Sequence, residues 1–189
     1  MKRLGIYFFF DKDGIVDKYV DYVLEDLTKH VDKLIVVCNG QLNERGRKTF
    51  EKFTGNIIVR ENKGFDVWAY KTAIDSEGWN KLIEYDEIIL MNYTIMGPVY
   101  PLKEMFDIMD KRLELDFWGI TKCFQENSPV AQQIWQCPYG YIPEHIQSSF
   151  MAFRRSIVSS AIFQKYWDEM PMIKSYYESG GSHEQYITK

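Results

Sequence analysis

The residues that most directly suggest chemistry stand where an apolar run ends, within the segment 86–101. The run 88–91 is long enough for a buried strand, and the polar side chains of Asn92 and Thr94 follow it at once, with a Gly-Pro turn just beyond. Ligands of open α/β sheets bind beyond the carboxyl ends of the strands, so Asn92 and Thr94 are candidate ligand contacts. The alternative is that the two side chains only cap a turn, which Asn and Thr often do.

A second group of chemically suggestive residues follows the apolar run 56–59. Gly64 allows close approach of the backbone, and the residues after it begin a predicted helix that reaches about residue 74. Arg60, Lys63 and Lys71 surround the start of this helix, where free backbone amides also attract negative charge. The segment therefore predicts a site for an anionic group, with a plain cationic surface as the alternative.

Alternating apolar runs and helical periods predict one α/β domain that positions these residues. The predicted strands cover residues 4–10, 33–38, 56–59, 88–91, 115–121 and 148–153. The predicted helices cover residues 15–30, 42–53, 65–74, 102–112, 156–167 and 170–177, and a Gly-rich turn at 179–182 leads into a last one. In the helix 156–167, Ser156 is the expected cap, and Ile157, Ala161 and Ile162 are the expected inward residues.

Residues 124–141 lack clear periodicity and contain Gly, Pro, Gln and aromatic residues. The segment predicts a long ordered loop of the kind that builds binding sites. The chain stops soon after its last predicted helix begins, which predicts a domain that belongs to a longer protein.

Composition narrows the classes of function. Hydrophobic residues make up 46% of the 189 residues and aromatic residues 16%, which excludes a disordered chain and favours a pocket with aromatic walls. The net charge of -4 and the absence of a basic block make nucleic acid a poor candidate partner. Three widely spaced cysteines indicate neither a zinc site nor a disulfide framework and fit a reducing cytoplasm. The apolar run near the N-terminus is too short to span a membrane, which leaves a surface contact or a missing segment as routes to one.

Four segments in a fixed order resemble a known family. They are RENKGFD at 60–66, NYTIMGPVYP at 92–101, DFWG at 116–119 and HIQSSF at 145–150. Together they resemble the rhamnan synthesis protein F family of bacterial cell-surface polysaccharide glycosyltransferases. The resemblance implies a GT-A-like fold over residues 1–189, an open, mixed and mostly parallel sheet sandwiched by helices. It also implies a nucleotide-diphosphate-sugar donor at the strand ends, a glycan or lipid-linked glycan acceptor in the adjoining cleft, and residues 124–141 as the acceptor-side wall.

One departure from the pattern concerns the metal. Many GT-A enzymes hold a divalent cation with an Asp-x-Asp motif after the strand that corresponds to 86–91, but this chain has Asn92-Tyr93-Thr94 there. Mg²⁺ and Mn²⁺ prefer carboxylate oxygen, so Asp66 or Asp116 would have to bind the ion. Otherwise Arg60 and the nearby lysines would neutralise the leaving diphosphate, and metal-independent transfer is the favoured interpretation.

The resemblance also assigns roles to single residues. An inverting single displacement, implied by an activated β-L-rhamnose that gives an α-linked rhamnan, needs a carboxylate base. Glu184 is the preferred candidate, followed by Asp116 and Glu144. The expected donor contacts are Phe9, Arg60, Asn62, Gly64, Asp66, Lys71, Asn92 and Thr94. The expected acceptor or sugar contacts are Trp118, His145, Gln147 and Ser148. Glu184 as a helix-terminal charge and His145 as a hydrogen-bonding residue at a strand entry are the alternatives to these roles.

Three hypotheses of function remain open. The first is an active cytoplasmic transferase. Peripheral contact with the inner face of the plasma membrane, and the presence of other transferase domains in the same chain, are open alternatives under this hypothesis. The second is an inactive module that binds nucleotide sugar or glycan and assists a neighbouring transferase, which the missing carboxylate at 92–94 favours. The third is another nucleotide-binding α/β protein, such as a nucleotidyltransferase or an oxidoreductase, which the lack of a GxGxxG or GxxxxGK loop disfavours.

Overall fold

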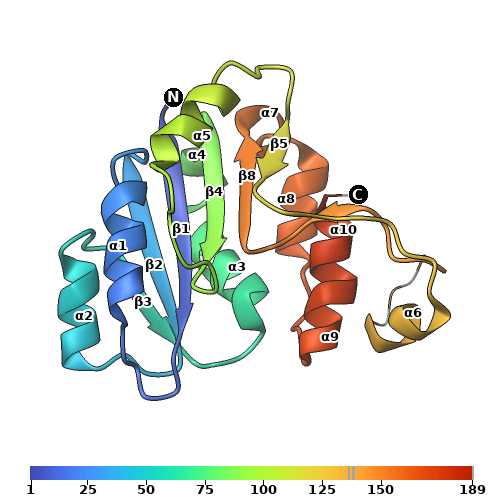
Figure 1. The fold of residues 1–189 in the computed structure, drawn as a ribbon, viewed down its shortest axis with the longest axis horizontal. Helices are drawn as coiled ribbons and strands as arrows, with labels where there is room; N and C mark the ends of the chain where they lie inside the picture. The colour runs from blue at the N-terminus through green and yellow to red at the C-terminus, as the bar shows by residue number, and fades with distance from the viewer. Residues whose placement is uncertain (136, 138, 189) are drawn as a thin grey trace.

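The computed structural model describes residues 1–135, 137 and 139–188, which fold around one main sheet (Figure 1). Within this part of the chain the sheet has six strands in the order β3-β2-β1-β4-β8-β5. The strands are β1 (Arg3–Phe10), β2 (Lys33–Asn39), β3 (Ile57–Arg60), β4 (Glu87–Asn92), β5 (Phe117–Gly119) and β8 (Phe150–Arg154). A short antiparallel pair, β6 (Lys122–Cys123) and β7 (His145–Ile146), forms a separate arm.

Helices lie on both faces of the sheet (Figure 1). Those before the arm are α1 (Lys18–Leu27), α2 (Glu44–Glu51), α3 (Phe65–Glu77), α4 (Trp79–Leu82) and α5 (Leu102–Met109). Those in and after it are α6 (Pro129–Trp135), α7 (Arg155–Val158), α8 (Ala161–Asp168), α9 (Tyr176–Ser179), the π-helical turn η1 (Gly180–Glu184) and α10 (Gln185–Ile187). No helix in the described part of the chain is both long and apolar enough to cross a bilayer.

Strand direction creates the edge at which a ligand could bind. β1 runs parallel to β2 and β4, and β3 runs parallel to β2, whereas β8 is antiparallel to both β4 and β5. Phe8 pairs with Asn92 across β1 and β4, so the carboxyl ends of these two central strands are level. The strand order reverses between β1 and β4, the position where open α/β sheets bind ligands. The expected mixed, mostly parallel sheet sandwiched by helices is confirmed.

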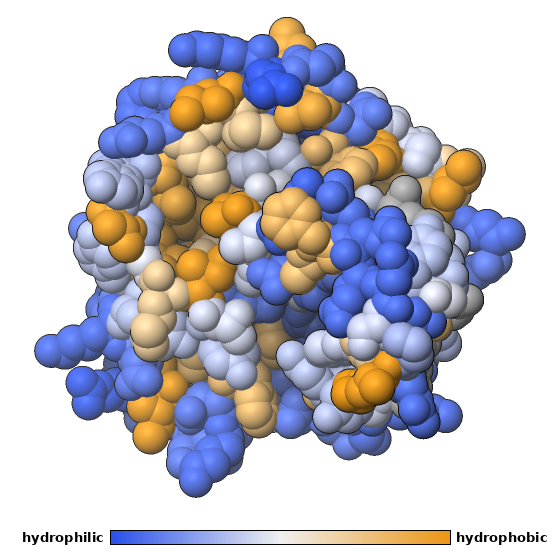
Figure 2. All heavy atoms as spheres, turned by 45° about the vertical axis from the view of Figure 1, so that its right-hand side comes forward, coloured by the Kyte–Doolittle hydropathy of each residue, from blue (hydrophilic) through white to orange (hydrophobic). Residues whose placement is uncertain are grey.

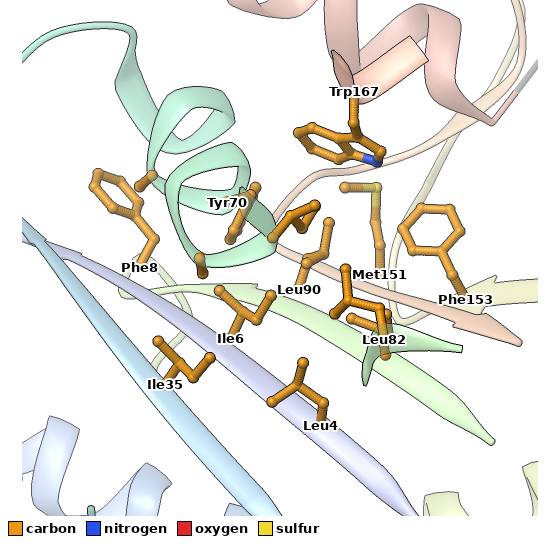
Figure 3. Close-up of a cluster of buried hydrophobic side chains, with 14 of the residues drawn as sticks. Leu4, Ile6, Phe8, Ile35, Tyr70, Leu82, Leu90, Met151, Phe153 and Trp167 are labelled. Carbon is orange, nitrogen blue, oxygen red and sulfur yellow. The ribbon is translucent and has the colours of Figure 1, made fainter. Parts of the chain in front are cut away.

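Strand alternation divides the core between the two faces. On one face, Leu4, Ile6 and Phe8 of β1 project toward α3, which carries the buried Tyr70 (Figure 3). On the other face, Tyr7 and Phe9 pack with residues of α1, α2 and α5. The first predicted helix is confirmed, since α1 buries its apolar residues at the expected helical spacing: Val20, Val23, Leu24 and Leu27.

A buried charge network closes the end of the sheet opposite the ligand-binding edge. Glu87 is fully buried at the start of β4, and its carboxylate accepts hydrogen bonds from Arg3 Nε at 2.8 Å and Trp118 Nε1 at 2.7 Å. Arg154 Nε lies 3.1 Å from the same carboxylate. Two cations and an indole N–H therefore satisfy a charge that would be costly to bury alone.

The C-terminal part departs from the sequence-based prediction. The expected helix 156–167 is two helices, α7 and α8, and the cap of α8 is Ser160, whose hydroxyl accepts a bond from Phe163 N. The break changes the helical phase, so Phe163 and Trp167 face inward, while Ile162 is 84% exposed. The prediction that Ala161 and Ile162 face inward was wrong.

Two further segments differ from their predictions. Residues 124–141 were expected to be a loop but include α6 and also Glu126, which forms an isolated antiparallel bridge with Ile142. Positions 136 and 138 of this segment lie outside the described residues. The expected Gly-rich turn at 179–182 is helical instead, because α9, η1 and α10 follow one another without a break. Figure 2 shows one face of the molecule, on which groups of hydrophobic residues are separated by hydrophilic ones.

Candidate functional site

A cavity of about 840 Å³ opens at the carboxyl ends of β1 and β4. Residues of the sheet edge and of the start of α3 form one wall, and residues of the arm, α6 and the helices α9 to α10 form the other. The lining combines aromatic rings with amides, hydroxyls and carboxylates, which is typical of a site for a polar organic ligand.

Asn92 closes the turn after β4 and also faces the cavity. Its Oδ1 accepts hydrogen bonds from both the backbone N–H, at 3.1 Å, and the hydroxyl of Thr94. Its Nδ2 donates to Asp66 Oδ2 at 3.4 Å. The turn-capping role and the cavity-lining position considered for Asn92 and Thr94 are therefore both found.

The start of α3 presents Asp66 to the cavity. Gly64 precedes the helix with a φ of 75°, a conformation that favours glycine, and a Cβ atom there would lie 2.4 Å from Trp68 Cγ. Asp66 follows two residues later, partly buried, with Ser179 Oγ 3.4 Å from its Oδ1. Burial raises the pKa of Asp66, the hydrogen bond from Asn92 works against this shift, and the nearby Glu184 carboxylate adds to it.

Glu184 lies in η1 and is held by Ser148 and His145. Ser148 donates its backbone N–H and its hydroxyl to Glu184 Oε2, at 2.7 and 2.6 Å. His145 Nε2 lies 3.5 Å from Oε1, and its Nδ1 donates to the carbonyl oxygen of Pro143 at 2.8 Å. Burial alone would raise the pKa of Glu184, but the bonds from His145 and Ser148 outweigh it and leave the pKa below its usual value.

His145 has the complementary shift. Burial lowers its pKa, yet the interaction with Glu184 and the bond to Pro143 together raise it above the ordinary value. A ring that already donates from Nδ1 must be protonated to donate from Nε2 as well. Burial and partners thus shift the pKa values of Asp66 and Glu184 in opposite directions, up at Asp66 and down at Glu184.

The structure brings together eight of the residues singled out from the sequence. These line the one cavity: Asn62, Asp66, Asn92, Thr94, His145, Gln147, Ser148 and Glu184. They come from segments far apart in the chain, which meet because β8 returns antiparallel beside β4.

The expected cationic cluster does not face the cavity. The Arg60 guanidinium donates to Asn39 Oδ1 and to the carbonyl oxygen of Lys63, so it ties β3 to the following turn. Lys63 pairs with Glu61, and Lys71, which is 8% exposed, pairs with Asp75 one turn further along α3. These three cations stabilise the segment locally, and the prediction that they gather around a diphosphate does not fit their positions.

Asp116 and Trp118 do not line the cavity either. β5 runs parallel to β4, so Asp116, just before β5, lies at the edge of the sheet opposite the cavity, where Ser156 donates to it. Trp118 is 4% exposed and bonds to Glu87 in the core. Neither position fits the roles considered for these residues, which were base, metal ligand or sugar contact.

Three other expected contacts also lie outside the cavity. Glu144 is exposed and pairs with Lys122, because alternation along the arm turns His145 inward and Glu144 outward. Phe9 points into the α1 face of the core, and its neighbours Phe8 and Phe10 line the cavity instead. Gly64 acts through the backbone conformation that begins α3.

Sequence reasoning missed several lining residues, among them Lys122, Trp135 and Gln185. Strand alternation could have identified Phe8 and Phe10, since both lie on the opposite face from Phe9. No comparable sequence pattern marks Trp135 or Gln185, whose positions depend on how the arm packs against the last helices. Lys122 is the one Lys or Arg among the described lining residues.

The lining was tested for a divalent-cation site. Among the described residues no three His, Cys, Asp or Glu side chains converge as metal ligands. The Asn92 amide oxygen already accepts two bonds from Thr94, which leaves Asp66 as the available carboxylate at the sheet edge. One carboxylate fits an ion that takes its remaining ligands from a bound diphosphate, and it does not fit a site built by the protein alone.

Comparisons with known proteins agree with this architecture. The family model described as rhamnan synthesis protein F matches residues 34–189. An uncharacterized protein of Sinorhizobium fredii, y4gN, is 23% identical over 150 residues, which are 79% of this chain and 35% of that protein. The chain therefore spans about a third of the length of this curated relative.

Two solved structures are among the matches to this chain. A CMP:2-keto-3-deoxy-manno-octonic acid synthetase complexed with CTP matches with a TM-score of 0.50 and 14% identity, over 97% of this chain and 83% of that one. Glucosyl-3-phosphoglycerate synthase from Mycobacterium tuberculosis in complex with UDP matches with a TM-score of 0.49 and 13% identity, over 82% of this chain and 57% of that one.

Proposed function

Because the chain belongs to the rhamnan synthesis protein F family, we propose that it transfers a hexose or deoxyhexose, such as rhamnose, from a nucleotide sugar to a glycan during synthesis of bacterial surface polysaccharide. The observation that carries the proposal is the single cavity at the switch point of the sheet, in which Asp66, Asn92 and Glu184 meet. Such a cavity suits a ligand with a flat base, a sugar and charged phosphates.

The donor is proposed to bind at the sheet edge. Phe8 and Phe10 offer aromatic surface there, and Asn62, Asn92 and Thr94 offer amide and hydroxyl groups. Lys122 supplies positive charge on the arm side, where it also pairs with Glu144.

The proposed chemistry is one inverting displacement. A carboxylate takes the proton of an acceptor hydroxyl as that oxygen forms a bond to the anomeric carbon. The bond from this carbon to the phosphate oxygen breaks with its electron pair, and the nucleoside diphosphate leaves. The carboxylate base and the stabilisation of the leaving group are the two contributions required of the protein.

Glu184 is the proposed base. Its Oε2 already accepts two bonds from Ser148, while among the described residues Oε1 is approached only by His145 Nε2, at 3.5 Å, and can accept from an acceptor hydroxyl. Asp66 is proposed to contact the donor, either directly or through a divalent ion shared with the diphosphate. Such an ion, when bound, neutralises charge that develops on the leaving group.

A second candidate function rests on the same contacts. The bonds that lower the pKa of Glu184 also weaken it as a base, and the turn after β4 has no carboxylate. These features favour a module that binds nucleotide sugar or glycan without turnover and assists a neighbouring transferase.

The test is incubation of the protein with UDP-, dTDP- and GDP-linked hexoses and deoxyhexoses plus saccharide acceptors, with Mn²⁺ or with EDTA. Release of nucleoside diphosphate that Glu184→Gln abolishes is the expected result, and the matched control Glu169→Gln should be as active as the wild type because Glu169 is exposed and lies outside the cavity. Donor binding without release would favour the inactive module. Absence of both binding and release would overturn the proposal.

A further inference from the structure

Gln185 is buried, faces the cavity and lacks a partner for its amide oxygen. Its exposed fraction is 3%, and it belongs to the lining. Oε1 is buried and has no hydrogen-bond partner among the described residues. A buried acceptor without a partner is destabilising, so a ligand that donates to it would gain from the pairing.

Trp135 lies at the same wall, where its indole packs closely against Gly180. A Cβ atom on Gly180 would lie 2.5 Å from Trp135 Cε3, so only glycine at this position of η1 admits the indole. The indole also lies 5.5 Å from the ring of Tyr176, centroid to centroid. Trp135 and Tyr176 both line the cavity, and together they form an aromatic surface there.

This wall is separate from the sheet edge. Trp135 belongs to α6, and Tyr176, Gly180 and Gln185 belong to the helices α9, η1 and α10. Figure 1 shows α6 on the far side of α9 from β1, β2 and β3. A ligand that fills the cavity would therefore meet the two groups of residues with different parts of its structure.

We propose that Trp135, Tyr176 and Gln185 form a subsite for a neutral saccharide, namely the acceptor glycan. The assignment to an acceptor rests on the proposed glycosyl transfer. A primary amide carries both donor and acceptor groups and so pairs with a sugar hydroxyl, which does the same. The apolar C–H face of a pyranose packs on an aromatic ring, which supplies contact area without charge.

The subsite is placed next to the proposed base. Gln185 follows Glu184 directly in the chain, and both line the same cavity. A saccharide that rests on Trp135 and bonds to Gln185 is thereby held beside the carboxylate that takes its proton. Trp135 and Gln185 are specificity-determining residues in this proposal, and neither has a role in bond breaking.

Saturation-transfer NMR and calorimetry with methyl α-L-rhamnopyranoside, methyl β-D-glucopyranoside and UDP test the subsite. Gln185→Leu keeps the approximate shape of the side chain but cannot bond to a hydroxyl, and Gly180→Ala displaces the indole through its new methyl group. We expect each variant to bind the saccharides about tenfold more weakly, as loss of one buried hydrogen bond or of the aromatic contact implies. Binding of UDP should remain within about twofold in both variants.

The stability of Gln185→Leu separates a ligand contact from a structural role. Because Oε1 has no internal partner, the melting temperature of this variant should equal or exceed that of the wild type. Tyr22→Ala, which removes an exposed tyrosine far from the cavity, is the control for surface aromatic loss.

Three outcomes would overturn the subsite. They are unchanged saccharide binding in both variants, loss of UDP binding in place of saccharide binding, and failure of the wild type to bind either saccharide while it still binds UDP. In each of these cases the proposed transferase function still stands, and the acceptor would bind at another wall of the cavity. Failure of the wild type to bind UDP, dTDP and GDP as well as the saccharides would instead overturn the proposed function together with the subsite.

Discussion

Ser148 donates both its backbone N–H and its hydroxyl to the same oxygen of Glu184, at 2.7 and 2.6 Å. The two residues are separated by 36 positions in the chain, and their contact joins the segment just before β8 to η1. This contact fixes the orientation of the carboxylate and contributes to its lowered pKa.

Replacing Ser148 tests that orientation. Ser148→Ala removes the hydroxyl bond and keeps the backbone bond, so the pKa of Glu184 should rise. If Glu184 is the base, the acid limb of the pH–rate profile moves to higher pH, and unfolding in urea should show a loss of about 1–2 kcal/mol at pH 7. Ser149→Ala is the control, because that hydroxyl lies beside Thr121 and not beside Glu184. An unmoved acid limb in Ser148→Ala would remove Glu184 from the base role.

Asp66 should show a conflict between stability and binding. Burial raises its folded pKa, so its ionisation destabilises the fold as the pH rises from the unfolded value through the folded one. Asp66→Asn should therefore melt at a higher temperature than the wild type at pH 7, while donor binding weakens about tenfold. Asp107→Asn, whose carboxylate is exposed and pairs with the exposed Lys103 on α5, should change neither quantity appreciably. A lower melting temperature for Asp66→Asn would contradict this expectation.

His183 should make the fold sensitive to acid. It is fully buried in η1, its Nδ1 bonds to the Tyr166 hydroxyl, and burial lowers its pKa from 6.5 to about 4. The unfolded chain binds the proton at a higher pH than the folded chain does. The free energy of unfolding therefore decreases by ~3 kcal/mol as the pH falls from 6.5 toward 4. Between pH 7 and pH 4.5, the free energy of unfolding measured in urea should decrease less for His183→Gln than for the wild type. Equal declines in variant and wild type would exclude His183 as the source.

Glu87 should be the most costly charge to remove. Glu87→Ala leaves Arg3 Nε, Arg154 Nε and the Trp118 N–H buried without their partner, which typically costs about 3–5 kcal/mol. Glu84→Ala, whose carboxylate is 63% exposed and pairs with Lys2, should cost less than about 1 kcal/mol. Urea denaturation of the two variants checks the contrast, and a similar cost for both would contradict it.

Local sequence patterns were sufficient to predict the parallel half of the fold. The apolar runs of β1, β2 and β4 and the spacing of Val20, Val23, Leu24 and Leu27 each reflect burial on known faces, so periodicity identified them. Asp66 and Asn92 could be placed at one edge because the carboxyl ends of parallel strands meet there.

Residues whose place depends on long-range packing could not be found in this way. Asp116 stands at the head of its predicted strand, but the sequence does not show that β5 runs parallel to β4, which puts this head at the edge opposite the cavity. Trp118 resembles a sugar-stacking residue until its N–H is seen to bond to the buried Glu87. The break at Ser159 and Ser160 reverses which side of α8 is buried, and a single helical period cannot reveal it.

The antiparallel return of β8 beside β4 affects how the two sides of the cavity can change during evolution. Asn62, Asp66 and Asn92 of the cavity lie in the first half of the chain, whereas Ser148, Glu184 and Gln185 lie in the second. Genetic exchange at a crossover in the intervening stretch can replace one side of the cavity and keep the other. Under the proposed transfer, such an exchange would alter the acceptor side of the cavity and keep the donor side.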